Sequence, residues 1–203
     1  MILNIYMKKI LLIPIGYNCS ITEIINMHTN IIHERTPFEW NTSKNIDSII
    51  SLFKNNFDGF INENIIPDYL DNKQNAFFND KYNIVFNHDT KFDKNNKQYY
   101  FNKTIIMEKY NRRIKRLLEK IKIADILLFV RQSQNVDFRN KTLSVNLLNN
   151  KPYPTDENAL QKLHEFKNMY NDKEVIISYI DCENELDKFN KLIIELSINN
   201  EFI

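Results

Sequence analysis

Short apolar runs alternate with longer apolar stripes along the chain. Residues Lys9 to Ile15 are almost continuously apolar and end at Gly16, as expected for a strand that is covered on both faces. Further strands are predicted at positions 82–86, 126–130 and 175–180. Helical spacing of apolar residues predicts helices around positions 20–30, 46–57, 110–121, 160–170 and 186–196. Strands that alternate with helices indicate a three-layer α/β fold, with a mostly parallel sheet of about four to five strands and helices on both faces.

In two stretches the apolar residues show no sustained helical or strand-like spacing. Positions 60–80 contain Pro67 and many Asn residues and are predicted to be irregular, and positions 90–97 are predicted to be a polar loop. Asn45 or Ser43 is expected to cap the helix that follows them. No repeat or linker is visible, so residues 1–203 are expected to form one domain.

Composition and charge exclude several classes of partner. The chain is 43% hydrophobic and 26% charged, which is typical of globular domains. Lys and Arg number 27 against 26 Asp and Glu, so no overall field draws the chain to nucleic acid or an anionic membrane. The apolar run at 10–15 is interrupted by Pro14 and is too short for a signal peptide or for a bilayer span of ~20 residues. The expected partner is a peptide or small-molecule substrate, and the oligomeric state stays open.

The number and spacing of the cysteines bear on the cellular compartment and on the prediction of metal sites. Cys19 and Cys182 are too few for a disulfide scaffold, which favours a reducing compartment, and the cytoplasm is expected. The cysteines and histidines are also too scattered for a zinc site of the usual spacing, so no structural metal and no cofactor are predicted. Enrichment in Asn, Ile and Lys is typical of an AT-rich genome, such as that of a virus, a microbe or a protist.

The segments directly after the predicted strands carry the candidate chemistry, because ligands of parallel sheets collect beyond the carboxyl ends of the strands. These segments are Gly16-Tyr17-Asn18-Cys19, Asn87-His88-Asp89, Arg131-Gln132-Ser133 and Asp181-Cys182. Cys19 lies at the entrance of a predicted helix, where free N–H groups and the helix dipole favour a thiolate. Cys19 is therefore the candidate nucleophile.

A thiolate mechanism also needs a base and a group that orients the base. His88 and Asp89 supply both residue types. Because neighbouring residues on a strand face opposite ways, Asp89 can orient His88 only if the backbone turns there, so Asp181 and Asn18 remain alternatives. The structural alternative for Cys19 itself is a small buried side chain.

Three further features complete the predicted site. Arg131 follows a buried strand directly, which predicts that its guanidinium reaches the ligand end of the sheet and binds a carboxylate or phosphate. Gly16, Asn18 and the N–H groups near Cys19 are candidates for binding the oxyanion or the substrate. The segment 37–40 is expected to plug one end of the sheet with two large rings, which leaves its Glu at the margin of the site.

Five motifs occur in the order Ile13-Pro-Ile-Gly-Tyr-Asn-Cys19, Thr36-Pro-Phe-Glu-Trp40, Phe86-Asn-His-Asp89, Tyr110-Asn-Arg-Arg113 and Leu128-Phe-Val-Arg131. Over about residues 10–135 this pattern resembles a family of proteins described as putative papain-like cysteine peptidases. The resemblance implies that Cys19 is the nucleophile and His88 the base, and it implies a papain-like α+β fold as the alternative to a parallel sheet. A strand followed by Gly-x-Asn-Cys is also similar to the nucleophile turn of the serine-dependent lipase and esterase superfamily, with Cys in place of Ser.

The preferred interpretation is a cysteine-dependent hydrolase, peptidase or acyl transferase. In it Cys19 attacks a carbonyl, and His88 transfers the proton. The alternative is a non-catalytic α/β domain that binds an anion or a sugar nucleotide through Arg131 and the Gly16 turn, with Cys19 serving only as packing.

Overall fold

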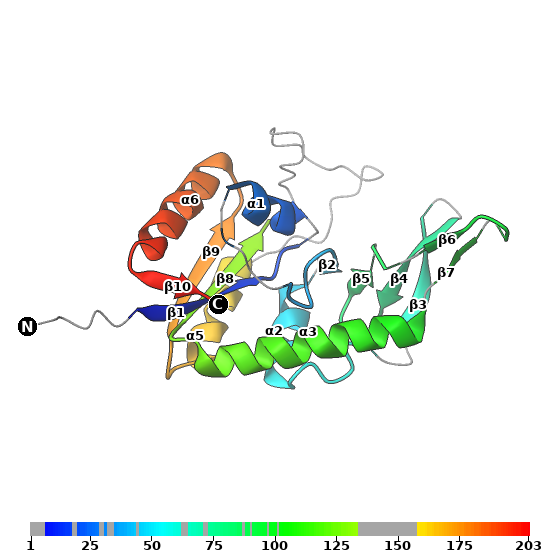
Figure 1. Ribbon diagram of the computed structural model, residues 1–203. Helices are drawn as coiled ribbons and strands as arrows, with labels where there is room; N and C mark the ends of the chain where they lie inside the picture. The colour runs from blue at the N-terminus through cyan, green and yellow to red at the C-terminus, as the bar shows by residue number, and fades with distance from the viewer. Residues whose placement is uncertain are drawn as a thin grey trace, which may run out of the picture.

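A four-stranded parallel sheet occupies one side of the protein, on the left in Figure 1. In this computed structural model the described residues are 7–17, 20–28, 31, 35–43, 45–61, 65–70, 73–86, 88–89, 91–96, 98–100, 102–133 and 158–203. The strands lie in the order β10 (Asn200–Phe202), β1 (Lys8–Pro14), β8 (Ile126–Gln132) and β9 (Glu174–Ile180). All three neighbouring pairs are parallel, and Leu12 of β1 faces Leu128 of β8. Nearly every residue of β1 and β8 is buried, as their continuous apolar runs predict.

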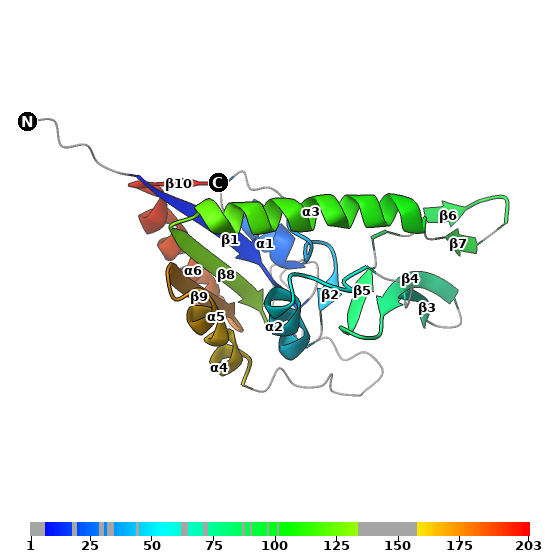
Figure 2. The same cartoon turned by 90° about the horizontal axis from the view of Figure 1, so that it is seen from below.

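Helices cover both faces of this sheet (Figure 2). Ile10 and Leu12 of β1 pack in one core cluster with α1 (Ser20–His28) and α6 (Glu183–Ser197). Leu11 and Ile13 point the other way, into a second cluster. That cluster includes residues of α2 (Ile46–Lys54), α3 (Lys103–Ile123), α4 (Ala159–Leu163) and α5 (Glu165–Met169). The three layers confirm the predicted α/β class, whereas the papain-like α+β alternative would have a largely antiparallel central sheet.

A smaller antiparallel sheet lies beside the parallel one. Its strands run in the order β2 (Thr42–Ser43), β5 (Ile84–Phe86), β4 (Lys73–Asn79) and β3 (Ile65–Leu70). A separate hairpin is made by β6 (Lys91–Asp93) and β7 (Gln98–Tyr100). The long helix α3 starts near this hairpin and ends beside the parallel sheet (Figure 2).

Three predictions about elements need correction. The strand predicted at 82–86 begins at Ile84 and pairs antiparallel with β2 and β4, so it does not belong to the parallel sheet. The stretch 60–80 is not irregular, because it contains β3 and β4. Its Pro67 is tolerated because β3 is the edge strand of the antiparallel sheet. The predicted loop at 90–97 contains β6.

The helix caps and helix composition follow local sequence rules. Asn45 caps α2 as predicted, since its side chain accepts a hydrogen bond of 2.8 Å from the Asp47 N–H. Asn102 caps α3 in the same way, with 3.2 Å to the Ile105 N–H. Among the helices in the described part of the chain, none combines the length and the apolar character needed to cross a bilayer.

Candidate active site

The turn after β1 is held by donors from two distant residues. The Ile15 carbonyl accepts from Arg131 Nη1 at 2.8 Å, and the Gly16 carbonyl accepts from Ser43 Oγ at 2.7 Å. The Tyr17 carbonyl accepts from the Ser43 N–H at 2.8 Å. Asn18 and Cys19, which follow this turn, lie outside the described residues, and α1 begins at Ser20. The turn that leads to the predicted nucleophile is thus fixed at the carboxyl end of β1.

Arg131 itself is fully buried at the end of β8. Besides the Ile15 carbonyl, its guanidinium donates to the Ser43 carbonyl through Nη2 at 3.3 Å. These contacts place the side chain between β1 and the segment that contains Ser43. The predicted role of Arg131 as an anion ligand stays a prediction, because the described contacts are with main-chain carbonyls.

His88 is an exposed side chain whose ring lies against Trp40. The two ring centroids are 5.2 Å apart with an interplanar angle of 69°, which is an edge-to-face contact. Trp40 has a left-handed backbone conformation with φ of 68°. Within the described structure its buried indole Nε1 has no hydrogen-bond partner. The imidazole is therefore open to solvent on one side and supported by the indole on another.

Asp89 is buried and is bonded to α3. One carboxylate oxygen accepts from Lys109 Nζ, and the other lies 2.5 Å from the Tyr110 hydroxyl. The same hydroxyl lies 2.9 Å from Asn41 Oδ1. A hydroxyl carries one proton, and the carboxylate is the stronger acceptor of it. The role of Asp89 in orienting His88 stays a prediction, since these contacts tie the residue to Tyr110 and Lys109.

Burial is the main influence on the pKa values of Tyr110 and Lys109, which form a cluster with Asp89. It raises the pKa of Tyr110 well above its ordinary value, and the nearby negative charge of Asp89 raises that pKa further. Burial also lowers the pKa of Lys109, although the hydrogen bond to Asp89 opposes this change. The cluster therefore keeps Tyr110 protonated as a donor to Asp89.

The segment 37–40 packs only in part as predicted, because the Phe38 ring lies in the core whereas Trp40 is half-buried and belongs to neither core cluster. Phe38 is buried and stacks on Phe53 with centroids 5.7 Å apart. Glu39 is also buried, rather than marginal, and its Oε1 accepts from the Thr36 N–H at 3.0 Å. This packing fixes the start of the segment that supplies Trp40, Asn41 and Ser43.

Residues 11–160 match the model of a protein family described as "Putative papain-like cysteine peptidase (DUF1796)". The chain belongs to this family. No curated protein matches the chain, and no solved structure does.

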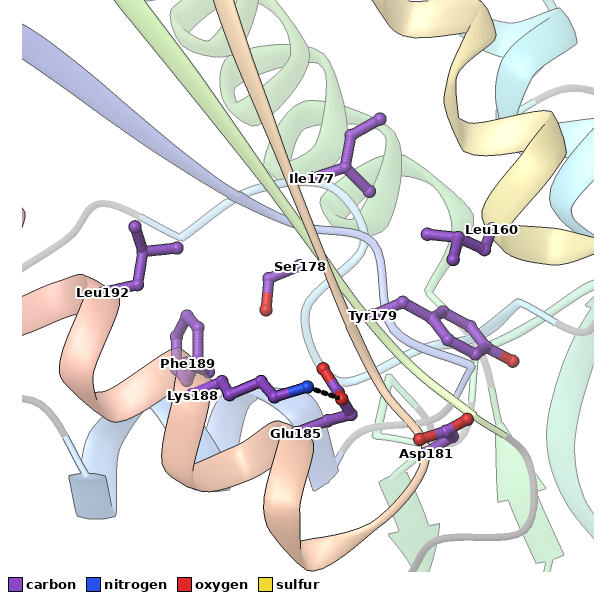
Figure 3. Close-up of a pocket in the computed structure, with 9 residues that line it drawn as sticks. All are labelled: Leu160, Ile177, Ser178, Tyr179, Asp181, Glu185, Lys188, Phe189 and Leu192. Atoms are coloured by element: carbon purple, nitrogen blue, oxygen red, sulfur yellow. Dashed lines mark hydrogen bonds and ion pairs between the residues drawn. The ribbon is translucent and has the colours of Figure 1, made fainter.

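The peptidase-family match contains every residue of the predicted site that follows β1, β5 and β8. It ends before β9 and α6, so most of the pocket drawn in Figure 3 lies beyond it. That pocket, of about 490 Å³, lies along β9 and the first turns of α6, where Lys188 and Glu185 form an ion pair of 2.6 Å. Asp181, the alternative orienting residue, lines this pocket, whereas neither His88 nor Tyr17 does.

Among the described residues, no three His, Cys, Asp or Glu side chains are grouped closely enough to hold a metal ion.

The sequence patterns indicate other roles for three residues of this site, which are Ser43, Trp40 and Tyr110. Their patterns indicate a helix cap, a core plug and a core stripe. Their contacts join positions far apart in the chain, and no local signal marks them.

Proposed function

We propose that this member of the peptidase family is a cysteine-dependent hydrolase in which Cys19 is the nucleophile and His88 is the base. One observation carries the proposal: the turn leading to Cys19 and the ring of His88 both contact the short segment from Trp40 to Ser43. Ser43 bonds to Gly16 and Tyr17, and Cys19 follows Tyr17 by two residues. The segment itself spans at most about 11 Å, so the Gly16–Tyr17 turn and the His88 ring contact the same short stretch of chain.

The proposed reaction is acyl transfer through a thioester. The Cys19 thiolate attacks the substrate carbonyl carbon, and the protonated His88 gives its proton to the leaving amine. Water then attacks the thioester carbonyl while His88 accepts a proton from it, and the thiolate is released. An acyl transferase differs only in the acceptor that replaces water. The exposure of His88 leaves its ring accessible to a substrate.

The family description supports a peptide as the substrate class. The alternative function, anion or sugar-nucleotide binding through Arg131, gains no support from a guanidinium that is fully buried and donates to the Ile15 and Ser43 carbonyls. A cytoplasmic location stays a prediction.

The test is the pH dependence of iodoacetamide alkylation, followed at each cysteine by peptide mass spectrometry. We expect Cys19 to react about tenfold faster than Cys182 at a pH two units below the ordinary thiol pKa of ~8.5, because a paired thiolate persists there. His88→Ala should remove this early reactivity. His164→Ala, which changes another exposed histidine, should retain it.

Equal alkylation rates at Cys19 and Cys182 across the pH range would contradict the proposal. That result would favour the non-catalytic binding domain, with Cys19 as a packing residue. If His88→Ala still shows fast alkylation of Cys19 at low pH, Cys19 would remain the proposed nucleophile, but His88 would no longer be its proposed base.

A further inference from the structure

We propose that Arg131 and Ser43 are positioning residues that hold the nucleophile turn, an inference that rests on the proposed function. Together they donate hydrogen bonds to the carbonyl oxygens of three consecutive residues, Ile15, Gly16 and Tyr17. The guanidinium also bonds to the Ser43 carbonyl, which links the two positioning residues to each other. We call Arg131 and Ser43 the cradle of the turn.

The cradle fixes the backbone that precedes Cys19. In an extended strand, successive carbonyls point to opposite sides, so donors on one side can reach only every second carbonyl. Here Ser43 alone reaches two successive carbonyls, one through its hydroxyl and one through its N–H. The chain must therefore turn around Ser43 at Gly16 and Tyr17, which precede Cys19 in the sequence.

Arginine suits this position better than any other cation. Its planar fork can donate to two acceptors at once, here the carbonyls of Ile15 and Ser43, whereas the lysine ammonium is a compact charge on a flexible stem. A fully buried guanidinium is costly unless it is hydrogen-bonded. The two carbonyl bonds offset that cost and join the end of β8 to Ile15, the residue after β1, and to Ser43.

The test separates a positioning role from a merely structural one. Ser43→Ala removes one hydroxyl bond of 2.7 Å to a main-chain carbonyl. Ser197→Ala is the matched control, because the Ser197 hydroxyl also donates to a main-chain carbonyl, that of Ile193, at 2.7 Å, but in α6. Arg131→Lys keeps a positive charge and removes the fork. Circular dichroism and a thermal melt of each variant set a temperature at which all are folded.

The readout is the pH profile of Cys19 alkylation. We expect Ser43→Ala and Arg131→Lys to lose about tenfold in the rate at low pH and to approach the wild-type rate at high pH, where every thiol is ionised. Ser197→Ala should keep the wild-type profile. Should Arg131→Lys fail to fold, Ser43→Ala still decides the question.

Two outcomes are distinguishable. A folded Ser43→Ala protein with the wild-type profile overturns the cradle alone, because the early reactivity of the wild type would still support the Cys19 and His88 pair. A wild-type protein without early reactivity overturns the proposed function, and the assignment of the cradle falls with it.

Discussion

Trp40 is the residue at which several local costs coincide. A bulky side chain at φ of 68° is strained by about 1–3 kcal/mol. The buried indole N–H, which has no partner within the described structure, adds a further cost of the same order. In return, the indole lies against the ring of His88. Strain of this kind collects at functional sites, which agrees with a role for Trp40 in supporting the imidazole.

The contact between Trp40 and His88 can be followed by fluorescence, because Trp40 is the one tryptophan of the chain. Loss of an edge-to-face ring contact changes the surroundings of the indole. We therefore expect His88→Gln to change the emission spectrum of Trp40. His164→Gln, at another exposed histidine, should leave that spectrum unchanged. An emission spectrum of His88→Gln that is identical to that of the wild type would refute the contact.

Tyr110 joins Asp89 to Asn41 through its hydroxyl. Tyr110→Phe removes that hydroxyl and leaves the buried Asp89 carboxylate with one donor fewer, so the free energy of unfolding should fall by about 1–3 kcal/mol in urea denaturation. Tyr170→Phe is the control, because no hydrogen bond is described for its hydroxyl, and it should change stability by less than about 0.5 kcal/mol.

Alkaline pH provides a second readout of Tyr110. Its pKa is raised in the folded state, by burial first and by Asp89 next, so the folded protein holds this proton more tightly than the unfolded chain. The resulting stability is present below the unfolded value of about 10 and is lost as the pH rises above it. Tyr110→Phe should therefore show a shallower loss of stability above that pH. An unchanged slope would mean that Tyr110 titrates alike in both states.

At the scale of elements, local signals predicted the helices and three strands of the parallel sheet, but they assigned the strand at 82–86 to the wrong sheet. The apolar stripe at Tyr110, Leu117 and Ile121 lies on the buried face of α3, because a helical stripe needs only one partner surface. The apolar run at Ile84–Phe86 could serve either sheet, since it is buried on both faces in the antiparallel one. The edge strand β10 has three residues and no distinctive pattern, so the sequence did not reveal it.

The cap of α2 is an element-scale prediction with a direct test. Asn45→Ala removes the acceptor of the Asp47 N–H and should lower the free energy of unfolding by about 1 kcal/mol. Asn168→Ala makes the same chemical change at an exposed position inside α5. It should not destabilise the protein, because alanine has the higher helix propensity. Equal losses in the two variants would show that the cap contributes nothing specific.

At the scale of the whole molecule, the sequence predicted that Gly16 and Arg131 lie at strand ends, but it did not predict the contacts that hold them there. Gly16 and Arg131 lie at the carboxyl ends of β1 and β8, as the apolar runs indicate. The bond between Arg131 and Ile15 joins residues 116 positions apart, and the bond between Ser43 and Gly16 joins residues 27 apart. Such pairings depend on the packed fold, so periodicity and spacing cannot supply them.

One core cluster runs through both sheets, since it contains Ile13 and Phe129 of the parallel sheet and Ile84 and Phe86 of the antiparallel one. We therefore predict a single cooperative unfolding transition, as expected of one domain. Trp40 fluorescence reports on the antiparallel side, and far-ultraviolet circular dichroism reports chiefly on the helices. Their urea midpoints should coincide. Two separated midpoints would divide the chain into independently folding units.

The most direct measurement of cysteine-dependent acyl transfer uses p-nitrophenyl acetate, an activated ester that needs no specific recognition. The account predicts a burst of p-nitrophenol and an acetyl group on Cys19 in the acylated protein, with both lost in Cys19→Ala and both slowed in His88→Ala. Cys182→Ala should behave like the wild type. Release of p-nitrophenol at the same rate in the wild type and in Cys19→Ala, with no acetyl group on Cys19, would contradict the account.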